Sequence, residues 1–218
     1  MPRALRADAA RNRTVLLAAA AEEFAERGMD ASVADIARRA GIGKGTVFRH
    51  FPTKDDLLGA IVLDRVDSLA ALARELFLAD DAGPALFTFL EAAAGKQQQL
   101  DLSFLREAGE INERLTEARE RLYAAIIALV QRAQTAEALR ADVTGLDVIL
   151  MMCVPAYVVS YVPGAAPDLW RRYLAMVIDG LRPEGAHPLG PPSPVGAGRR
   201  LRHATSPVQA PKSRGRYT

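Results

Sequence analysis

The sequence of 218 residues contains one cysteine, Cys153, and three histidines, so it has few of the residues that build disulfides and transition-metal sites. A single thiol excludes an internal disulfide, and the scattered histidines show no metal-ligand spacing. We therefore expect no metal and no cofactor. A reducing compartment suits this cysteine content, and a lone cysteine among apolar neighbours is expected to be an inert buried thiol.

Long hydrophobic runs and catalytic motifs are also missing. The most apolar segment, Val148 to Val159, is twelve residues long and interrupted only by Pro155, whereas about 20 are needed to cross a bilayer. The apolar run Val15–Ala21 is followed directly by two glutamates, which a secretory signal would not contain. No nucleophile elbow, phosphate loop or acid–base pair appears, so we predict no catalytic residue, no enzyme and no membrane partner.

Acidic residues are nearly absent from residues 183–218, which contain six Lys or Arg against one acid, Glu184. The same segment holds seven prolines and five glycines. It cannot bury enough apolar surface to offset the entropy of ordering, so we predict a disordered basic tail. Its charge would serve solubility, or would add non-specific affinity for phosphates.

What the sequence does contain is a pair of short helices between Ser32 and Phe51. Ser32 and Asp35 form a capping-box-like pair, and apolar residues follow at helical spacing. Gly41 stands where a helix needs a left-handed residue to end, and a second helix is predicted from about Lys44 to Phe51. This pattern is typical of a helix-turn-helix, whose second helix reads DNA, although a plain helical hairpin fits this stretch alone equally well.

The second helix leaves small and basic residues on its outer side. Val47 and Phe51 fall together on the opposite side and must pack inward. Gly45 removes a side chain where a backbone would approach a groove. Arg49 can pair bidentately with guanine, and Thr46 can touch a phosphate or a thymine methyl.

The residues that follow this pair of helices form a more specific pattern. Thr53 and Asp56 form a second capping box directly after Pro52. From Ala40 to Leu58 the glycines, aromatics, cap and lysine together resemble the DNA-binding domain of the TetR family of bacterial transcriptional regulators. The resemblance covers about residues 9–68.

This resemblance implies roles for particular residues. The first helix would contact a phosphate, the second would enter a groove, and His50 and Lys54 would touch backbone phosphates. The expected DNA-binding residues are Ser32, Lys44, Gly45, Thr46, Phe48, Arg49, His50 and Lys54. Two positions depart from the family pattern: relatives often carry Ser at Gly43, and usually carry Tyr at Phe48, where its hydroxyl reaches a phosphate.

No convincing strand appears, so we predict an all-α fold. An N-terminal three-helix helix-turn-helix domain is expected at 9–68, with the motif itself at 32–51. A larger helical effector-binding and dimerisation domain would follow at 69–182, before the tail at 183–218. The helices expected after the motif lie at about 53–79, 84–98, 100–108, 112–132, 148–159 and 167–182.

The segment from Val148 to Val159 is predicted to be one helix that is apolar all round and therefore buried on every side. One side would face the core and the other a second copy of the chain; burial within a monomer is the alternative. Together with the last helix it would form a four-helix dimer interface. The expected interface residues are Leu150, Cys153, Val154, Trp170, Leu174, Val177 and Leu181.

The resemblance further implies a small-molecule effector that binds among the middle helices. Its binding would change the spacing of the two DNA-binding domains of a dimer and release DNA. Candidate lining residues are Phe89, Phe104, Tyr123, Met151, Met152 and Tyr157, although apolar residues at helical spacing are more often plain core. No charged constellation indicates a particular effector.

The predicted function is that of a cytoplasmic, nucleoid-associated bacterial repressor. Its expected partners are a palindromic double-stranded DNA operator, a second copy of the chain and an unknown small molecule. Two alternatives stay open. One is an architectural DNA-binding protein that responds to no effector. The other is an adaptor that has lost DNA binding; the intact Lys44, Gly45, Thr46 and Lys54 argue against it.

Overall fold

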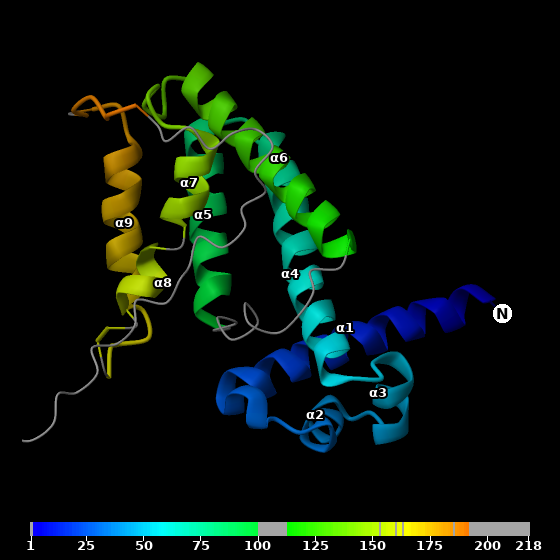
Figure 1. The fold of residues 1–218 in the computed structure, drawn as a ribbon. Coiled ribbons are helices and arrows are strands. Elements are labelled where there is room, and N and C mark those ends of the chain that lie inside the picture. The colour runs from blue at the N-terminus through cyan, green and yellow to red at the C-terminus, as the bar shows by residue number, and fades with distance from the viewer. Residues whose placement is uncertain are drawn as a thin grey trace, which may run out of the picture. The chain divides into compact units, whose positions relative to one another are not determined.

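The computed structural model describes residues 2–99, 113–152, 154–159, 161–162, 164–184 and 186–191. Every regular element within these ranges is a helix (Figure 1), so the predicted all-α fold is confirmed. The short helix expected at 100–108 lies outside the described residues, as does most of the predicted tail. No helix in the described ranges is long and apolar enough to cross a membrane.

The structure describes the following helices. In order they are α1 (Pro2–Arg27), the 3-10 turn η1 (Gly28–Asp30), α2 (Val33–Ala40), α3 (Lys44–His50), α4 (Lys54–Phe77), α5 (Ala82–Gln99), α6 (Glu113–Thr135), α7 (Gly145–Met151), α8 (Val154–Val159) and α9 (Leu169–Leu181).

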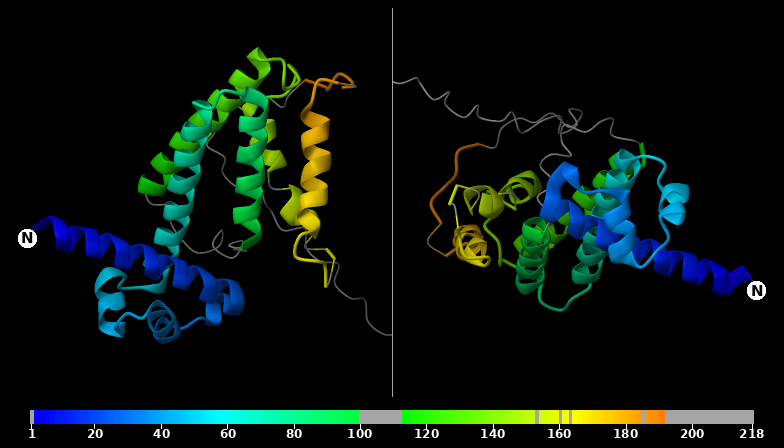
Figure 2. Two further views of the ribbon diagram at one scale, coloured as in Figure 1. Left: turned by 180° about the vertical axis from the view of Figure 1, so that it is seen from behind. Right: turned by 90° about the horizontal axis from the view of Figure 1, so that it is seen from below.

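Helices α1, α2, α3 and the beginning of α4 enclose one hydrophobic core, here called the head core. Its buried members are Leu16, Leu17, Ala20, Phe24, Ala31, Ile36, Ala37, Val47, Phe51, Leu57, Leu58 and Ile61. Figures 1 and 2 show α2 and α3 packed together beside α1. The turn between α2 and α3 forms because Gly41 adopts a left-handed φ of 66°, which favours glycine. The predicted helix-turn-helix is therefore present.

A second hydrophobic core, here called the C-terminal core, is built from α4, α5, α6, α7 and α9, and includes Phe89, Leu129 and Trp170. Helix α4 contributes to both cores, because Leu57 and Leu58 belong to the head core while Leu69 and Ala73 belong to the C-terminal core. The beginning of α4 is fixed by the predicted capping box: the Thr53 hydroxyl accepts the N–H of Asp56 at 3.1 Å, and the Asp56 carboxylate accepts the N–H of Thr53 at 3.0 Å.

The other end of α4 is fastened by Arg132 of α6. Its guanidinium donates to the carbonyl oxygens of Leu76, Ala79 and Asp80, and lies 5.9 Å from the centre of the Phe77 ring. The last carbonyls of a helix lack the usual intrahelical partners, and a cation beside them also complements the helix dipole. Helix α4 is thus held at both ends.

The single all-apolar helix predicted from Val148 to Val159 is wrong, because the structure divides this segment into α7 and α8. Pro155 has no N–H to donate to the carbonyl of residue 151, and its ring would clash there, so a proline at this position kinks or breaks a helix. Proline is tolerated in a first turn, where it stands in α8. Val148 and Pro155 are buried, but Leu150, Met151 and Tyr157 are exposed, so the segment is not buried on every side.

Candidate nucleic-acid interface

Helix α3 has one side buried in the head core and the other exposed. Val47 is fully buried, and Phe51, directly after the helix, is buried as well. The residues around the rest of the helix that are exposed are Lys44, Gly45, Phe48, Arg49 and His50, here called the exposed face of α3. Thr46, at the edge of this face, is half-buried. Six of the eight predicted DNA-binding residues therefore lie on this helix.

Two features of this face bear on how closely another surface can approach. A Cβ atom built on Gly45 meets no atom within 4 Å, so the helix backbone is bare and the space in front of it is open. One turn away, the Lys44 ammonium lies 5.9 Å from the centre of the Phe48 ring, in cation–π geometry. The face thus combines bare backbone, cations and one exposed aromatic ring.

Ser32 and Lys54, the two residues outside α3 that are predicted to contact phosphates, both interact with other side chains of the free protein. The exposed Ser32 caps α2, since its hydroxyl accepts the N–H of Asp35 at 3.1 Å and donates to the Asp35 carboxylate at 2.6 Å. Lys54 is half-buried, with its ammonium 5.4 Å from the centre of the Phe24 ring in the head core. This cation–π contact offers a reason for a lysine in the first turn of α4, where its charge opposes the helix dipole.

A group of charged residues that was not predicted from the sequence, here called the α1–α2 ion-pair cluster, joins α1 to α2. Its members are Glu22, Glu23, Glu26, Arg27, Asp35, Arg38 and Arg39. Arg39 approaches three carboxylates of α1, with nitrogen–oxygen distances of 2.6 Å to Glu26 and 3.1 Å to Glu23. Acids at 22, 23 and 26 indicate one charged stripe on α1, but no spacing predicts which basic residue of another helix faces it.

Glu23 is the buried member of this cluster and, among the described residues with assigned burial, the one buried charged residue. Its side chain is 3% exposed and is flanked by Arg39 and by Arg27, whose Nε lies 3.5 Å away. A buried carboxylate is tolerated only with cations or donors beside it. Because α2 carries Arg39 and leads into α3, this contact helps to fix the helix-turn-helix against α1.

Removing Arg39, the nearer of the two cations beside this buried carboxylate, gives a stability prediction. We expect Arg39→Met to lower the free energy of unfolding more than Arg38→Met, which removes an exposed ion pair with Asp35. The double variant Glu23→Met with Arg39→Met should recover much of the loss, because it leaves no uncompensated buried charge. Urea unfolding followed by circular dichroism measures all three; a double variant as unstable as Arg39→Met would contradict the assignment.

Two carboxylates of the cluster have pKa values below their ordinary range. The Ser32 hydroxyl, and then Arg38, lower the pKa of Asp35 below its ordinary 3.8. The hydrogen bond from Arg39 lowers the pKa of Glu26 below its ordinary 4.5 and raises that of Arg39. Both carboxylates are therefore held in their charged forms in the folded protein.

A pH dependence of stability follows from these two shifts. The unfolded chain binds protons at the ordinary pKa values, so the stabilisation is fully present above them and is lost as the pH falls through the lowered folded values. We expect the free energy of unfolding to decrease from about pH 5 to pH 3. Urea unfolding across this range should show a shallower slope for Asp35→Asn and Glu26→Gln than for the native chain, and an unchanged slope would contradict the assignment.

The predicted effector-pocket residues differ in how deeply they are buried. Phe89 is fully buried in the C-terminal core, and Met152 packs against that core while half-buried. Tyr123 is half-buried, whereas Met151 and Tyr157 are exposed on α7 and α8. Phe104 lies outside the described residues.

The predicted dimer-interface residues divide into two groups. Trp170, Leu174 and Leu181 are buried in the chain's own C-terminal core, so little of their surface is left for a partner. Leu150 is exposed, and Val154 and Val177 are half-buried. Cys153 lies outside the described residues.

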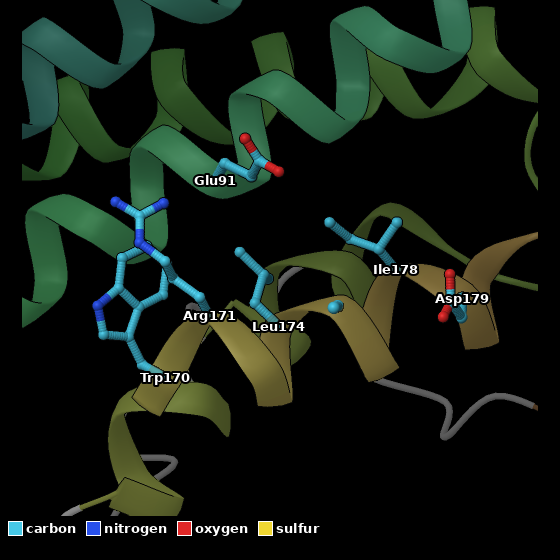
Figure 3. A pocket seen from close by; sticks show the side chains of 7 residues that line it. Glu91, Trp170, Arg171, Leu174, Ile178 and Asp179 are labelled. Atoms are coloured by element: carbon cyan, nitrogen blue, oxygen red, sulfur yellow. The ribbon is translucent and has the colours of Figure 1, made fainter. Parts of the chain in front are cut away.

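The structure shows a hollow between residues of α5 and α9 (Figure 3). It is lined by Glu91, Trp170, Arg171, Leu174, Ala175, Ile178 and Asp179. The Arg171 guanidinium lies over the Trp170 ring, 4.7 Å from its centre. None of the predicted effector-pocket residues that the structure describes lines this hollow. In the described part of the chain, no group of three or more His, Cys, Asp or Glu side chains could hold a metal ion.

Comparisons with known proteins agree with this geometry. Residues 16–61 match the model of bacterial regulatory proteins of the tetR family, and residues 81–183 match the C-terminal domain of SbtR-like transcriptional regulators. The crystal structure of a TetR transcription regulatory protein from Mycobacterium vanbaalenii is 34% identical, with a TM-score of 0.65 over 82% of this chain and 99% of that one. The chain belongs to the TetR family.

As a TetR-family member, it is a helix-turn-helix transcriptional regulator. The HTH-type transcriptional repressor Rv3405c of Mycobacterium tuberculosis is 54% identical over 48 residues, which cover 22% of this chain and 26% of that protein. The regulator SrpR of Pseudomonas putida is 30% identical over 147 residues, which cover 62% of this chain and 67% of that protein. The match to Rv3405c thus spans about a quarter of that repressor's length.

Proposed function

We propose that this TetR-family chain is a homodimeric repressor that binds a palindromic DNA operator and is released from it by a small-molecule effector. The observation that carries the proposal is the exposed face of α3, where cations and bare backbone stand in front of a buried Val47. Arg49 and Lys44 supply donors for guanine or phosphate, and Gly45 allows close approach. The name of Rv3405c, a repressor, supports repression rather than activation.

A dimer is proposed because one short helix contacts too few base pairs to be specific. Two heads related by a two-fold axis double the contact and require an operator with the same symmetry. Large apolar side chains are exposed in the segment from α7 to α9, which supports a second copy as their partner. They are Leu150, Met151, Tyr157, Tyr161, Val162 and Met176. The proposed interface keeps Leu150 and adds the exposed Met176 of α9 to the residues predicted from the sequence.

We propose that α4 couples effector binding to DNA binding. This helix is part of both hydrophobic cores and is held at each end, by the Thr53–Asp56 capping box and by Arg132. A ligand that binds one position of α4 better than another would change the spacing of the two heads. We accordingly propose a DNA-binding domain at 9–68 and an effector-binding and dimerisation domain at 69–182.

The experiment that tests this function is selection of bound sequences from random DNA, repeated with a panel of metabolites. We expect an enriched palindrome and the loss of that enrichment with one class of compound. Weak sequence preference with steep salt dependence, and no response to any compound, would support the architectural alternative instead. Sedimentation of the free chain should give the mass of a dimer; a monomer at micromolar concentration would contradict the proposed assembly.

A further inference from the structure

Phe48 is the feature of the exposed α3 face that phosphate binding does not explain. Its side chain is 45% exposed, whereas the other described phenylalanines of the head, Phe24 and Phe51, are buried. The exposed part of this ring contributes little to the fold, and covering it would be favourable in proportion to its apolar area. A binding partner that is apolar where it meets the ring would therefore be favoured.

The position of Phe48 on α3 places its ring among groups that face DNA. At about 100° per residue, Gly45 falls between Phe48 and Arg49 around the helix, and Val47 falls on the buried side. Gly45 has no side chain that could shield the ring or keep a groove away from it. The Lys44 ammonium lies on the other flank, 5.9 Å from the ring centre.

The major groove of DNA contains one kind of apolar group that a phenyl ring could contact. The edges of the base pairs there present hydrogen-bond donors and acceptors, and their distinct apolar group is the C5-methyl of thymine. A phenyl ring has no hydroxyl with which to bond a phosphate. We propose that Phe48 is a specificity-determining residue that contacts a thymine C5-methyl in each half of the operator, a role that rests on the function proposed above.

The expected size of the effect follows from the burial of one methyl group. Removing that group should weaken binding about fourfold in each half-site, and about fifteenfold when both half-sites are changed. The Lys44 ammonium beside the ring predicts, in addition, that the thymine neighbours a guanine that this lysine contacts.

The test uses the full chain and a selected palindromic operator. Each symmetry-related pair of thymines is replaced in turn by deoxyuridine, which lacks only the methyl group. We expect one pair whose replacement weakens native binding about fifteenfold, while Phe48→Ala binds the thymine and deoxyuridine operators equally. Phe48→Tyr keeps the ring and should keep the methyl effect. Phe48→Gln is a second variant in case the alanine variant folds poorly, which circular dichroism would show.

Two results would overturn the inference while leaving the proposed function intact. One is native binding that no deoxyuridine replacement weakens. The other is a methyl effect that Phe48→Ala retains in full, since another residue would then contact the methyl. Failure to select any operator is a distinct outcome, because it contradicts the proposed function itself and the Phe48 role with it.

Discussion

Replacing Arg49 by alanine is expected to relax the specificity of this regulator at one base pair of each operator half, by about 1–3 kcal/mol per half-site. Arg49 is exposed on α3, and around the helix it lies nearly opposite the buried Val47. A guanidinium there can donate two parallel hydrogen bonds to the O6 and N7 atoms of a guanine. Titration of the operator and of its single-base variants, at one fixed salt concentration, measures the change.

The control for Arg49→Ala is Arg49→Lys, which keeps the positive charge but cannot form the bidentate contact. We expect the lysine variant to bind scrambled DNA as the native chain does, while losing most of the discrimination at the same base pair. If the alanine variant loses affinity for operator and scrambled DNA equally, Arg49 contacts the backbone and not a base.

The second large effect is expected for Gly45→Ala, which should act in opposite directions on folding and on binding. A Cβ at this position meets no atom within 4 Å in the free protein, so alanine fits without strain. Alanine in place of glycine within a helix stabilises it by about 0.5–1 kcal/mol. In the complex the added methyl would stand between the helix backbone and the groove, and we expect a cost of about 1–3 kcal/mol, or roughly 5- to 150-fold in affinity.

Gly59 offers a matched control for this substitution. It lies within α4, and a Cβ built on it likewise meets no atom within 4 Å. Gly59→Ala should therefore raise stability by a similar amount and leave operator binding unchanged. Thermal unfolding and operator titration of both variants compare the two positions; unchanged operator binding by Gly45→Ala would mean that the backbone of α3 does not approach DNA closely.

The parts of the fold that local chemistry determines could be predicted from the sequence. Ser32 and Thr53 mark where α2 and α4 begin, since a side-chain cap acts within a single turn. Gly41 marks the end of α2, because its left-handed φ favours glycine. The inward side of α3 also followed from the spacing of Val47 and Phe51.

Other parts could not be predicted because they depend on which surfaces meet. Trp170, Leu174 and Leu181 have the spacing of a buried helical stripe, but spacing does not distinguish the chain's own core from a partner's. The contact of Arg39 with Glu23 joins two helices, and no local rule relates residues 16 positions apart. In the segment from Val148 to Val159, uniform apolarity suggested one helix, although Pro155 carried the information that it would break.

The measurement that tests the central claim most directly is methylation protection of the selected operator by dimethyl sulfate, which reacts with guanine N7 in the major groove. If two copies of α3 lie in two major grooves, the native chain should protect guanines in both half-sites, symmetrically about the dyad. Arg49→Ala should lose protection of one guanine in each half. Protection confined to one half-site, or none at any guanine N7 of a tightly bound operator, would contradict the account.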